Sequence, residues 1–190
     1  ERVKAAEFDY VRVRSVAEAC ERLRTAQGEA KIIAGGQSLV PLMAMRLARP
    51  TLLIDINDIP ELSGIAVTGG TLTIKAATRQ RAIERSNEVR ARLPLLAKAL
   101  RFVGHVQTRN RGTIGGSLAH ADPSAEIPLT AVTLDATLVA QSATGRNEYA
   151  VRDFFQSAMM TALPSDQCLI EVGFPLWSEA RVGTGFEEVA

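Results

Sequence analysis

Two glycine pairs constrain this 190-residue chain more than any other feature, because each predicts a backbone path that a side chain would obstruct. Gly35 and Gly36 follow Lys31 to Ala34, a short apolar run typical of a buried strand, and precede a candidate helix. Gly115 and Gly116 lie within the segment TIGGS. Backbone amides at such turns can hold a phosphate, and a Cβ would keep that phosphate away from them. Two separated turns therefore suit a diphosphate held between two lobes.

The two segments match no common nucleotide-binding or hydrolase motif. They contain neither the GK[ST] of a Walker loop nor GxGxxG, and Val40 replaces the second glycine of a GxSxG nucleophile elbow. The hydroxyls of Ser38, Thr113 and Ser117 could donate further hydrogen bonds to a diphosphate. The residues alone leave a second interpretation open, in which the segments are two unrelated tight turns.

The first third of the chain predicts a βαβαβ lobe. Ser15 and Glu18 form a capping box for the first helix, and Gly28 ends that helix. The expected elements are a strand at 10–13, a helix from Ser15, a strand at 31–34, a helix from Ser38 to Leu47, and a strand at 51–56.

A second lobe is expected after Pro60, and its strands are predicted by turn signals. Residues 68–70 indicate a hairpin between strands at 62–67 and 71–76, and Gly145-Arg146 indicates another between 136–141 and 147–151. Helices are expected before Phe102 and at 125–133, and a last strand at 169–174 ends at Pro175. Residues 103–125 show no clean period, so we predict a long irregular segment, which in a compact domain is usually functional.

Composition narrows the function classes. A net charge of +1 gives no strong field toward nucleic acid or anionic membrane. Two distant cysteines without a CxxC pair exclude a disulfide scaffold and a metal or iron–sulfur site built from this chain alone. No apolar stretch predicts a membrane span, and we expect a cytoplasmic protein. The basic residues that alternate with Glu84 and Glu88 predict a solvated helix face; they are Arg79, Arg81, Arg85, Arg90 and Arg92.

Longer segments resemble a known family. The pieces are AGGQSL at 34–39, ALRFVGHVQTRNRGTIGGSLAHADPSAE at 99–126, and LIEVGFP at 169–175. In this order they resemble the FAD-binding subunits of molybdenum hydroxylases of the carbon monoxide dehydrogenase and xanthine dehydrogenase type. Ser117 and His120 stand where members closer to xanthine dehydrogenase have Asn and Thr, so the second motif resembles the carbon monoxide dehydrogenase branch more closely.

The resemblance implies an α+β fold of two lobes with FAD extended between them, followed by a third domain that helps to cover the isoalloxazine ring. On this basis we expect an N-terminal lobe at 1–57, a second lobe at 58–178, and the start of the third domain at 179–190, with the rest of that domain missing.

Carried over by position, the resemblance predicts the cofactor-binding residues. They are Ile32, Ile33, Ala34, Gly35, Gly36, Gln37, Ser38, Leu39, Val103, Thr108, Gly112, Thr113, Gly115, Gly116, Ser117, His120, Asp122, Glu126 and Leu169. Structural explanations stay open for several of them. Asp122 with Pro123 could cap the next helix, and Glu126 suits a first-turn acid that meets the helix dipole. We expect His105 to be structural or exposed, and Trp177 and Phe186 to pack internally or against the missing domain.

The implied function is electron transfer by an oxidoreductase subunit with no catalytic residue and no metal of its own. The family places FAD between a 2Fe-2S small subunit, which receives electrons from a molybdopterin-binding large subunit, and an acceptor such as NAD, oxygen or a quinone. The three subunits form a heterotrimer, alone or dimerised. Two alternatives stay open, namely a stand-alone FAD-dependent oxidase or reductase and a bridging subunit that has lost FAD.

Overall fold

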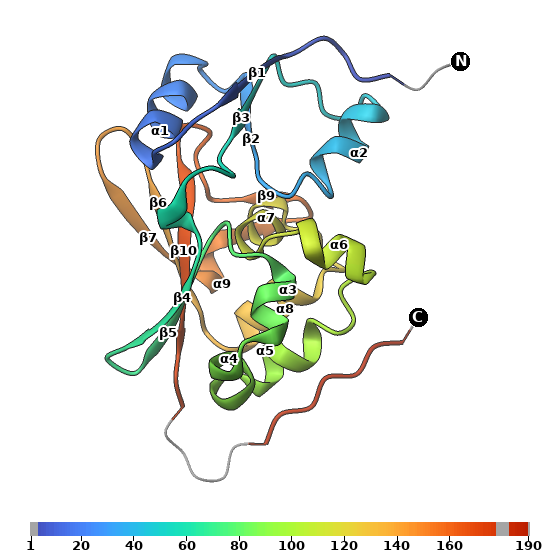
Figure 1. The fold of residues 1–190 in the computed structure, drawn as a ribbon, viewed down its shortest axis with the longest axis vertical. Coiled ribbons are helices and arrows are strands. Elements are labelled where there is room, and N and C mark those ends of the chain that lie inside the picture. Colours follow the sequence, from blue (N-terminus) through green and yellow to red (C-terminus); the bar gives the residue numbers. More distant parts are fainter. Residues whose placement is uncertain (1–3, 178–182, 190) are drawn as a thin grey trace.

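A computed structural model describes residues 4–177 and 183–189 of the chain and contains two main sheets (Figure 1). The first is parallel and holds β1 (Asp9–Arg12), β3 (Leu52–Asp55) and β2 (Ala30–Ile33), in that order. The helices α1 (Val16–Thr25) and α2 (Leu39–Ala44) connect these strands, as parallel pairing requires. The predicted βαβαβ order is confirmed.

The two helices of this lobe differ in how well the sequence predicted their ends. Ser15 caps α1 by accepting a hydrogen bond from the amide of Glu18 at 3.2 Å, and α1 ends before Gly28, whose φ is +94°. By contrast, α2 is shorter than expected because Arg46 has a φ of +59° and cannot continue it. Ser38 lies at the N-cap position of α2, but its side chain makes no capping hydrogen bond.

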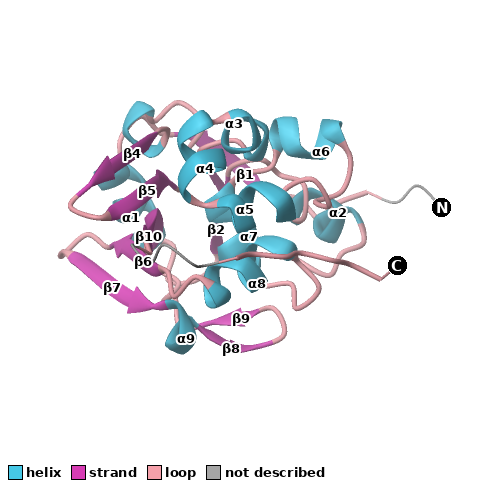
Figure 2. Ribbon diagram, turned by 90° about the horizontal axis from the view of Figure 1, so that it is seen from below, coloured by secondary structure: helices cyan, strands magenta, loops and turns pink. Residues whose placement is uncertain are grey.

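The second sheet is antiparallel, in the order β4-β5-β10-β6-β7. Its strands are β4 (Ile65–Thr68), β5 (Thr71–Lys75), β10 (Cys168–Pro175), β6 (Thr137–Gln141) and β7 (Arg146–Ala150), so both predicted hairpins are confirmed. The helices beside it are α3 (Gln80–Arg85), α4 (Asn87–Arg92), α5 (Pro94–Ala99) and α8 (Glu126–Thr133). Seen from below, they lie together on one side of this sheet (Figure 2). The remaining short elements are η1 (Pro60–Leu62), α9 (Val151–Phe154), β8 (Phe155–Ser157) and β9 (Met160–Thr161).

The segment at 103–125 is not irregular, contrary to the prediction. It contains α6 (Val106–Arg111) and α7 (Ile114–His120), both held by tertiary contacts. The buried guanidinium of Arg109 donates to the carbonyl of Val103 at 2.8 Å and to Glu84 at 3.1 Å. The hydroxyl of Thr113 caps α7 by accepting from the amide of Gly116 at 3.1 Å. These contacts offset the low helix propensity of a glycine-rich segment.

Strand β10 joins the two hydrophobic cores. Leu169, Val172 and Phe174 pack into the larger core, with the helices of the second lobe. Cys168 and Ile170 pack into the smaller core, with α1 and the parallel sheet. A register shift between Leu169 and Glu171 accompanies the change of face. The division at 57/58 remains a prediction, because one strand contributes to both cores.

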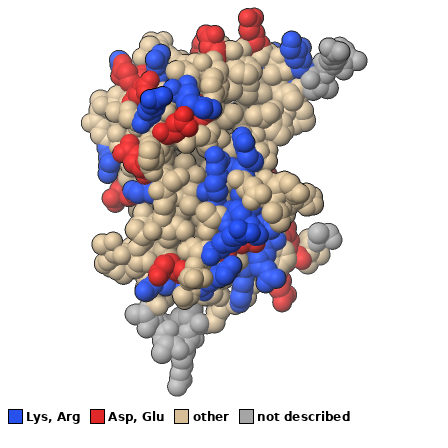
Figure 3. All heavy atoms as spheres, viewed as in Figure 1, with Lys and Arg blue, Asp and Glu red and all other residues tan. Residues whose placement is uncertain are grey.

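The surface over α3 to α6 gathers Lys and Arg side chains (Figure 3). In this region Arg81 and the buried Arg109 form ion pairs with Glu84, and Arg92 forms one with Glu88. Of the expected third domain, residues 183–189 are described and form no helix or strand, and the boundary at 178/179 lies outside the described residues. The ring of Phe186 packs on Phe102 with centroids 5.2 Å apart, whereas Trp177 is exposed. No helix among the described residues has the length and apolar character needed to cross a bilayer.

Candidate cofactor-binding site

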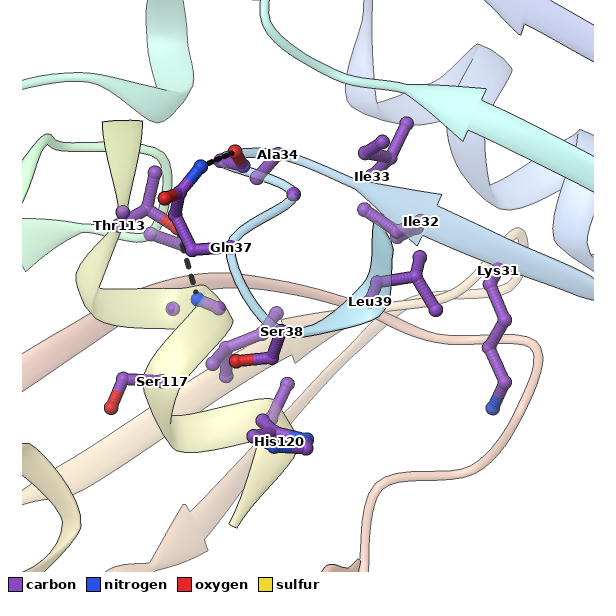
Figure 4. Close-up of a pocket in the computed structure, with 18 of the residues that line it drawn as sticks. Lys31, Ile32, Ile33, Ala34, Gln37, Ser38, Leu39, Thr113, Ser117 and His120 are labelled. Atoms are coloured by element: carbon purple, nitrogen blue, oxygen red, sulfur yellow. Dashed lines mark hydrogen bonds between the residues drawn. The ribbon is translucent and has the colours of Figure 1, made fainter. Parts of the chain in front are cut away.

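A groove of about 670 Å³ lies between the first glycine turn, which follows β2, and helix α7. All of the residues predicted to bind a cofactor line it, and their contacts with the cofactor stay a prediction. In the close-up, the turn lies beside the start of α7, and Ser38 and His120 stand on facing sides of the space between them (Figure 4). The fold therefore brings together two motifs that lie far apart in the sequence. The volume is within the range of small-molecule sites.

The first glycine turn offers unpaired backbone donors. Gly36 has a φ of +72°, a conformation that favours glycine. The side chain of Asn57 donates to the carbonyl of Ala34 at 2.9 Å, and the side chain of Gln37 donates to the carbonyl of Gly35 at 3.1 Å. Among the described residues, the amides of residues 35–39 donate to no other group. Several free N–H groups in one turn form a site for an anion.

The second glycine turn differs from the expectation, because its amides are already occupied. The amide of Ile114 donates to the carbonyl of Thr78 at 3.2 Å, and that of Gly115 donates to the carbonyl of Ala76 at 2.9 Å. The amide of Gly116 donates to the hydroxyl of Thr113. In this structure these three amides are therefore paired within the protein, and the binding of a diphosphate by this segment stays a prediction. The hydroxyls of this segment remain as possible donors.

Two of the glycines are required by contacts within the protein rather than by an approaching phosphate. A Cβ on Gly35 would overlap the carbonyl of Arg111 and lie 2.9 Å from Cα of Gly112. A Cβ on Gly115 would lie 2.6 Å from the Cβ of Ala76. The first glycine turn thus meets the backbone of Arg111 and Gly112, directly before TIGGS, and this contact brings the two glycine segments together at the groove.

A network of polar side chains holds the contact between the first glycine turn and the residues before TIGGS. Arg79 donates to the carbonyl of Arg111 and, at 2.6 Å, to the side chain of Asn57. Asn57 in turn donates to Asp55 at 2.5 Å. Burial alone would raise the pKa of Asp55, but hydrogen bonds from Tyr10 and Asn57 outweigh it and hold that pKa below its usual value. The ionised carboxylate therefore anchors the network.

The acidic residues of the groove have different surroundings. Burial raises the pKa of Glu126, the first residue of α8, with Glu188 and Asp122 as further causes. Hydrogen bonds from Ser124 lower the pKa of Asp122. Asp122 accepts from the amide of Ser124 at 2.9 Å and so forms a local turn, whereas the residue before α8 is Ala125. The structure thus supports the first-turn position of Glu126 but not the capping role of Asp122.

Both histidines of the second motif have defined positions. His120 is the last residue of α7, is half-buried and lines the groove. His105 precedes α6, is exposed and does not line the groove, in agreement with its predicted structural or surface position.

Sequence reasoning missed part of the groove wall. The segment that includes β9 contributes Met159, Met160, Thr161, Leu163, Pro164, Ser165 and Gln167. Its position is fixed by a hydrogen bond from the amide of Met159 to the carbonyl of Ala121 at 2.9 Å. Met159 has a φ of +57°, which methionine rarely adopts, so no residue type signals this turn. Gln80 also lines the groove and was not singled out, because it belongs to neither glycine motif.

Comparison with known proteins gives one family. Residues 6–177 match the family model described as the FAD binding domain in molybdopterin dehydrogenase. The chain is 41% identical to the 6-hydroxypseudooxynicotine dehydrogenase complex subunit alpha of Paenarthrobacter nicotinovorans, over 98% of this chain and 62% of that protein. It is 40% identical to the carbon monoxide dehydrogenase medium chain of Hydrogenophaga pseudoflava, over 94% of this chain and 61% of that protein.

Solved structures agree with this result. The structure of carbon monoxide dehydrogenase from Hydrogenophaga pseudoflava superposes with a TM-score of 0.89 at 40% identity, over 92% of this chain and 61% of that chain. Quinoline 2-oxidoreductase from Pseudomonas putida 86 gives a TM-score of 0.89 at 37% identity, over 92% of this chain and 61% of that chain. The chain therefore spans about three fifths of the length of the proteins that it matches.

Proposed function

Because this chain belongs to the family of FAD-binding domains in molybdopterin dehydrogenases, we propose that it is part of the electron-transferring flavoprotein subunit of a molybdenum hydroxylase complex. Its cofactor is FAD. The observation that carries the proposal is the groove in which the two glycine segments meet beside the unpaired amides of residues 35–39. These residues fit a dinucleotide, which has a diphosphate at its middle.

The proposed contacts follow from the donors available on each side of the groove. The amides of residues 35–39 bind the diphosphate oxygens, because negatively charged oxygens are the strongest acceptors for free N–H groups. The hydroxyls of Thr113 and Ser117 donate from the opposite side. Glu126, which enters the groove as the first residue of α8, accepts from hydroxyls of the cofactor.

FAD, when bound, supplies the redox chemistry by accepting electrons from one partner and releasing them to another. The protein contributes binding and orientation. Leu169, buried at the groove, supplies an apolar contact to a ring of the cofactor, and Val103 supplies another. The guanidinium of Arg109 donates a hydrogen bond to the carbonyl of Val103 and so helps to position this part of the groove wall.

The proposed partners are a 2Fe-2S small subunit that gives electrons to this FAD and a molybdopterin-binding large subunit that oxidises the substrate. Support comes from the names of relatives, which include a "complex subunit alpha" and a "medium chain" of dehydrogenases. NAD, oxygen or a quinone would then take the electrons from FAD. We also propose a cytoplasmic complex, in keeping with two buried thiols that form no disulfide among the described residues.

Purification of the native protein with its associated chains tests this function. We expect FAD, iron and molybdenum in one complex, and we expect bleaching of the visible flavin absorbance after substrate is mixed with the complex. Omission of the iron–sulfur subunit should abolish that bleaching, because electrons then have no path to the flavin.

The alternatives predict other outcomes of the same experiment. Rapid substrate oxidation by the flavoprotein alone would replace the proposal with a stand-alone oxidase or reductase. A complex that assembles normally but contains no flavin would replace it with a bridging subunit.

A further inference from the structure

Among the described residues, Oε1 of Gln80 is the one buried side-chain nitrogen or oxygen atom without a hydrogen-bond partner. The residue is 5% exposed, and its Oε1 atom is buried and unpaired. The other buried polar side chains have partners; Asp55, for example, accepts from Asn57, and Thr130 donates to Glu126. An unsatisfied buried acceptor costs about 1 to 3 kcal/mol, so Gln80 stands out energetically.

This side chain lies at the point where the two glycine segments meet. The backbone amide of Gln80 donates to the carbonyl of Gly112 at 2.9 Å. Its carboxamide lies against Gly112, since a Cβ there would be 2.7 Å from Oε1 and 2.9 Å from Cδ. On its other side, Gly112 faces Gly35. Gln80 also lines the groove, and in this structure its unpaired Oε1 atom is buried beside Gly112.

The chemistry of the cofactor selects the partner of this oxygen. A carboxamide oxygen accepts hydrogen bonds only, and the phosphate oxygens of a diphosphate at neutral pH also accept only. Hydroxyls flank the diphosphate of FAD on both sides, on the ribityl chain and on the adenosine ribose. The terminal torsion of glutamine is soft, so rotation of the carboxamide is the movement that would bring Oε1 to a cofactor hydroxyl.

We propose that Gln80 is a further cofactor-binding residue whose side-chain oxygen accepts a hydrogen bond from a hydroxyl next to the FAD diphosphate. The inference rests on the proposed placement of FAD in this groove. In this arrangement the free amides of the first turn bind the phosphates, and Gln80 accepts a hydrogen bond from an adjacent hydroxyl.

Gln80→Met tests the proposal, because methionine has a similar length and cannot accept this hydrogen bond. We expect the dissociation constant for FAD to rise about tenfold, as expected for loss of one buried hydrogen bond. The flavin-free variant should be as stable as the wild type or more stable, because the unpaired acceptor has been removed. A purely structural role predicts the reverse, namely lower stability and unchanged FAD affinity. Gln156→Met, at an exposed position of β8 outside the groove, is the matched control.

Titration of ADP beside FAD identifies the hydroxyl. Weaker binding of both ligands by Gln80→Met points to the ribose, and weaker binding of FAD alone points to the ribityl chain. If the wild type binds no FAD, the proposed function fails. If the wild type binds FAD and Gln80→Met binds it equally well, only the role of Gln80 fails.

A measurement on the wild type covers the case of a variant that does not fold. Nuclear magnetic resonance of the labelled protein follows the side-chain carboxamide carbon of Gln80 during FAD addition. A new hydrogen bond to Oε1 should shift this resonance downfield. An unchanged resonance at saturating FAD would overturn the proposal.

Discussion

Neighbouring glycines in this groove are needed for different reasons. Gly36 has a positive φ. Gly35 leaves room for the backbone of Arg111 and Gly112, and Gly115 leaves room for Ala76, which follows β5. Gly116 is exposed, and a Cβ there would meet only the hydroxyl of Thr113, at 2.9 Å. Packing within the protein therefore constrains Gly115 more than Gly116.

Gly115→Ala and Gly116→Ala should affect different properties. Gly115→Ala should lower the free energy of unfolding by about 1 to 3 kcal/mol, because its methyl group overpacks against Ala76. Gly116→Ala weakens the cap from Thr113 by about 1 kcal/mol but gains a similar helix propensity, so its stability should be close to that of the wild type. Its FAD affinity should still fall severalfold, because the methyl group adds volume at the groove. Thermal unfolding and FAD titration measure the two effects; normal FAD affinity in Gly116→Ala would contradict this assignment.

Cys168 should be inert although it lines the groove. Burial raises the pKa of its thiol to about 12, and burial also raises the pKa of Cys20. Because the thiolate is the reactive form, we expect no labelling of either cysteine by a thiol reagent at pH 8 in the folded protein. Both should react in denaturant, in step with the loss of circular dichroism. Rapid labelling of one thiol before unfolding would show that this part of the core is open.

At the scale of elements, Glu84 ties together two helices beside the groove. Its Oε2 atom accepts from Arg81 on α3 at 2.7 Å and from Arg109 on α6 at 3.1 Å. Burial alone would raise the pKa of Glu84, but these hydrogen bonds outweigh it and hold the pKa below its usual value. The carboxylate therefore stabilises the fold fully above about pH 4.3, and that stabilisation is lost as the pH falls through the lower pKa of the folded state.

Glu84→Gln should make stability less dependent on acidic pH. At pH 7 the variant should lose about 1 to 3 kcal/mol, because Arg109 keeps its burial but loses a charged partner. The difference from the wild type should shrink as the pH falls through the lowered pKa of Glu84 in the folded state, where the wild-type carboxylate becomes protonated. Urea unfolding from pH 7 to pH 3 measures this profile. Glu88→Gln, which breaks an exposed pair on α4, is the control and should cost less than about 1 kcal/mol. Parallel profiles for wild type and Glu84→Gln would exclude the role of this carboxylate.

The elements that the sequence predicted well have local causes. Ser15 and Glu18 determine the start of α1 within a few residues, and residues 68–70 determine the β4–β5 hairpin. By contrast, α6 depends on the contact of Arg109 with Glu84, which is 25 positions away in the sequence. No local pattern contains that contact, so residues 103–125 were predicted to be irregular.

The candidate site shows the same division between local motifs and distant contacts. The predicted residues of the glycine motifs all line the groove, and they could be named from the sequence because the motifs are contiguous and specific. Gln80 and the segment around Met159 were missed because the fold alone brings them there. The pairing of the amides of Ile114 and Gly115 was not foreseen for a related reason: their partners, Thr78 and Ala76, belong to another part of the chain.

At the scale of the whole molecule, the two lobes share β10, and this sharing constrains how they unfold. Ile170 belongs to the smaller core with α1, and Val172, two residues later, belongs to the larger core. Separation of the lobes would expose both faces of one strand and would remove buried side chains from each core at once. The groove proposed to bind FAD lies between the same two parts, so its shape depends on their staying together.

We therefore expect one cooperative unfolding transition, with equal calorimetric and van't Hoff enthalpies. Ile170→Ala and Val172→Ala delete side chains from different cores, yet each should destabilise the whole protein in one transition. The free energy of unfolding should fall by about 2 to 4 kcal/mol for Ile170→Ala and by less for Val172→Ala, because valine is smaller. FAD at a free concentration of about 100 times its dissociation constant should raise the free energy of unfolding by about 2.7 kcal/mol, because the ligand binds only when both walls of the groove are folded. Differential scanning calorimetry with and without FAD measures all three effects. Two separate transitions, with Ile170→Ala moving only one of them, would instead establish residues 1–57 as an autonomous domain.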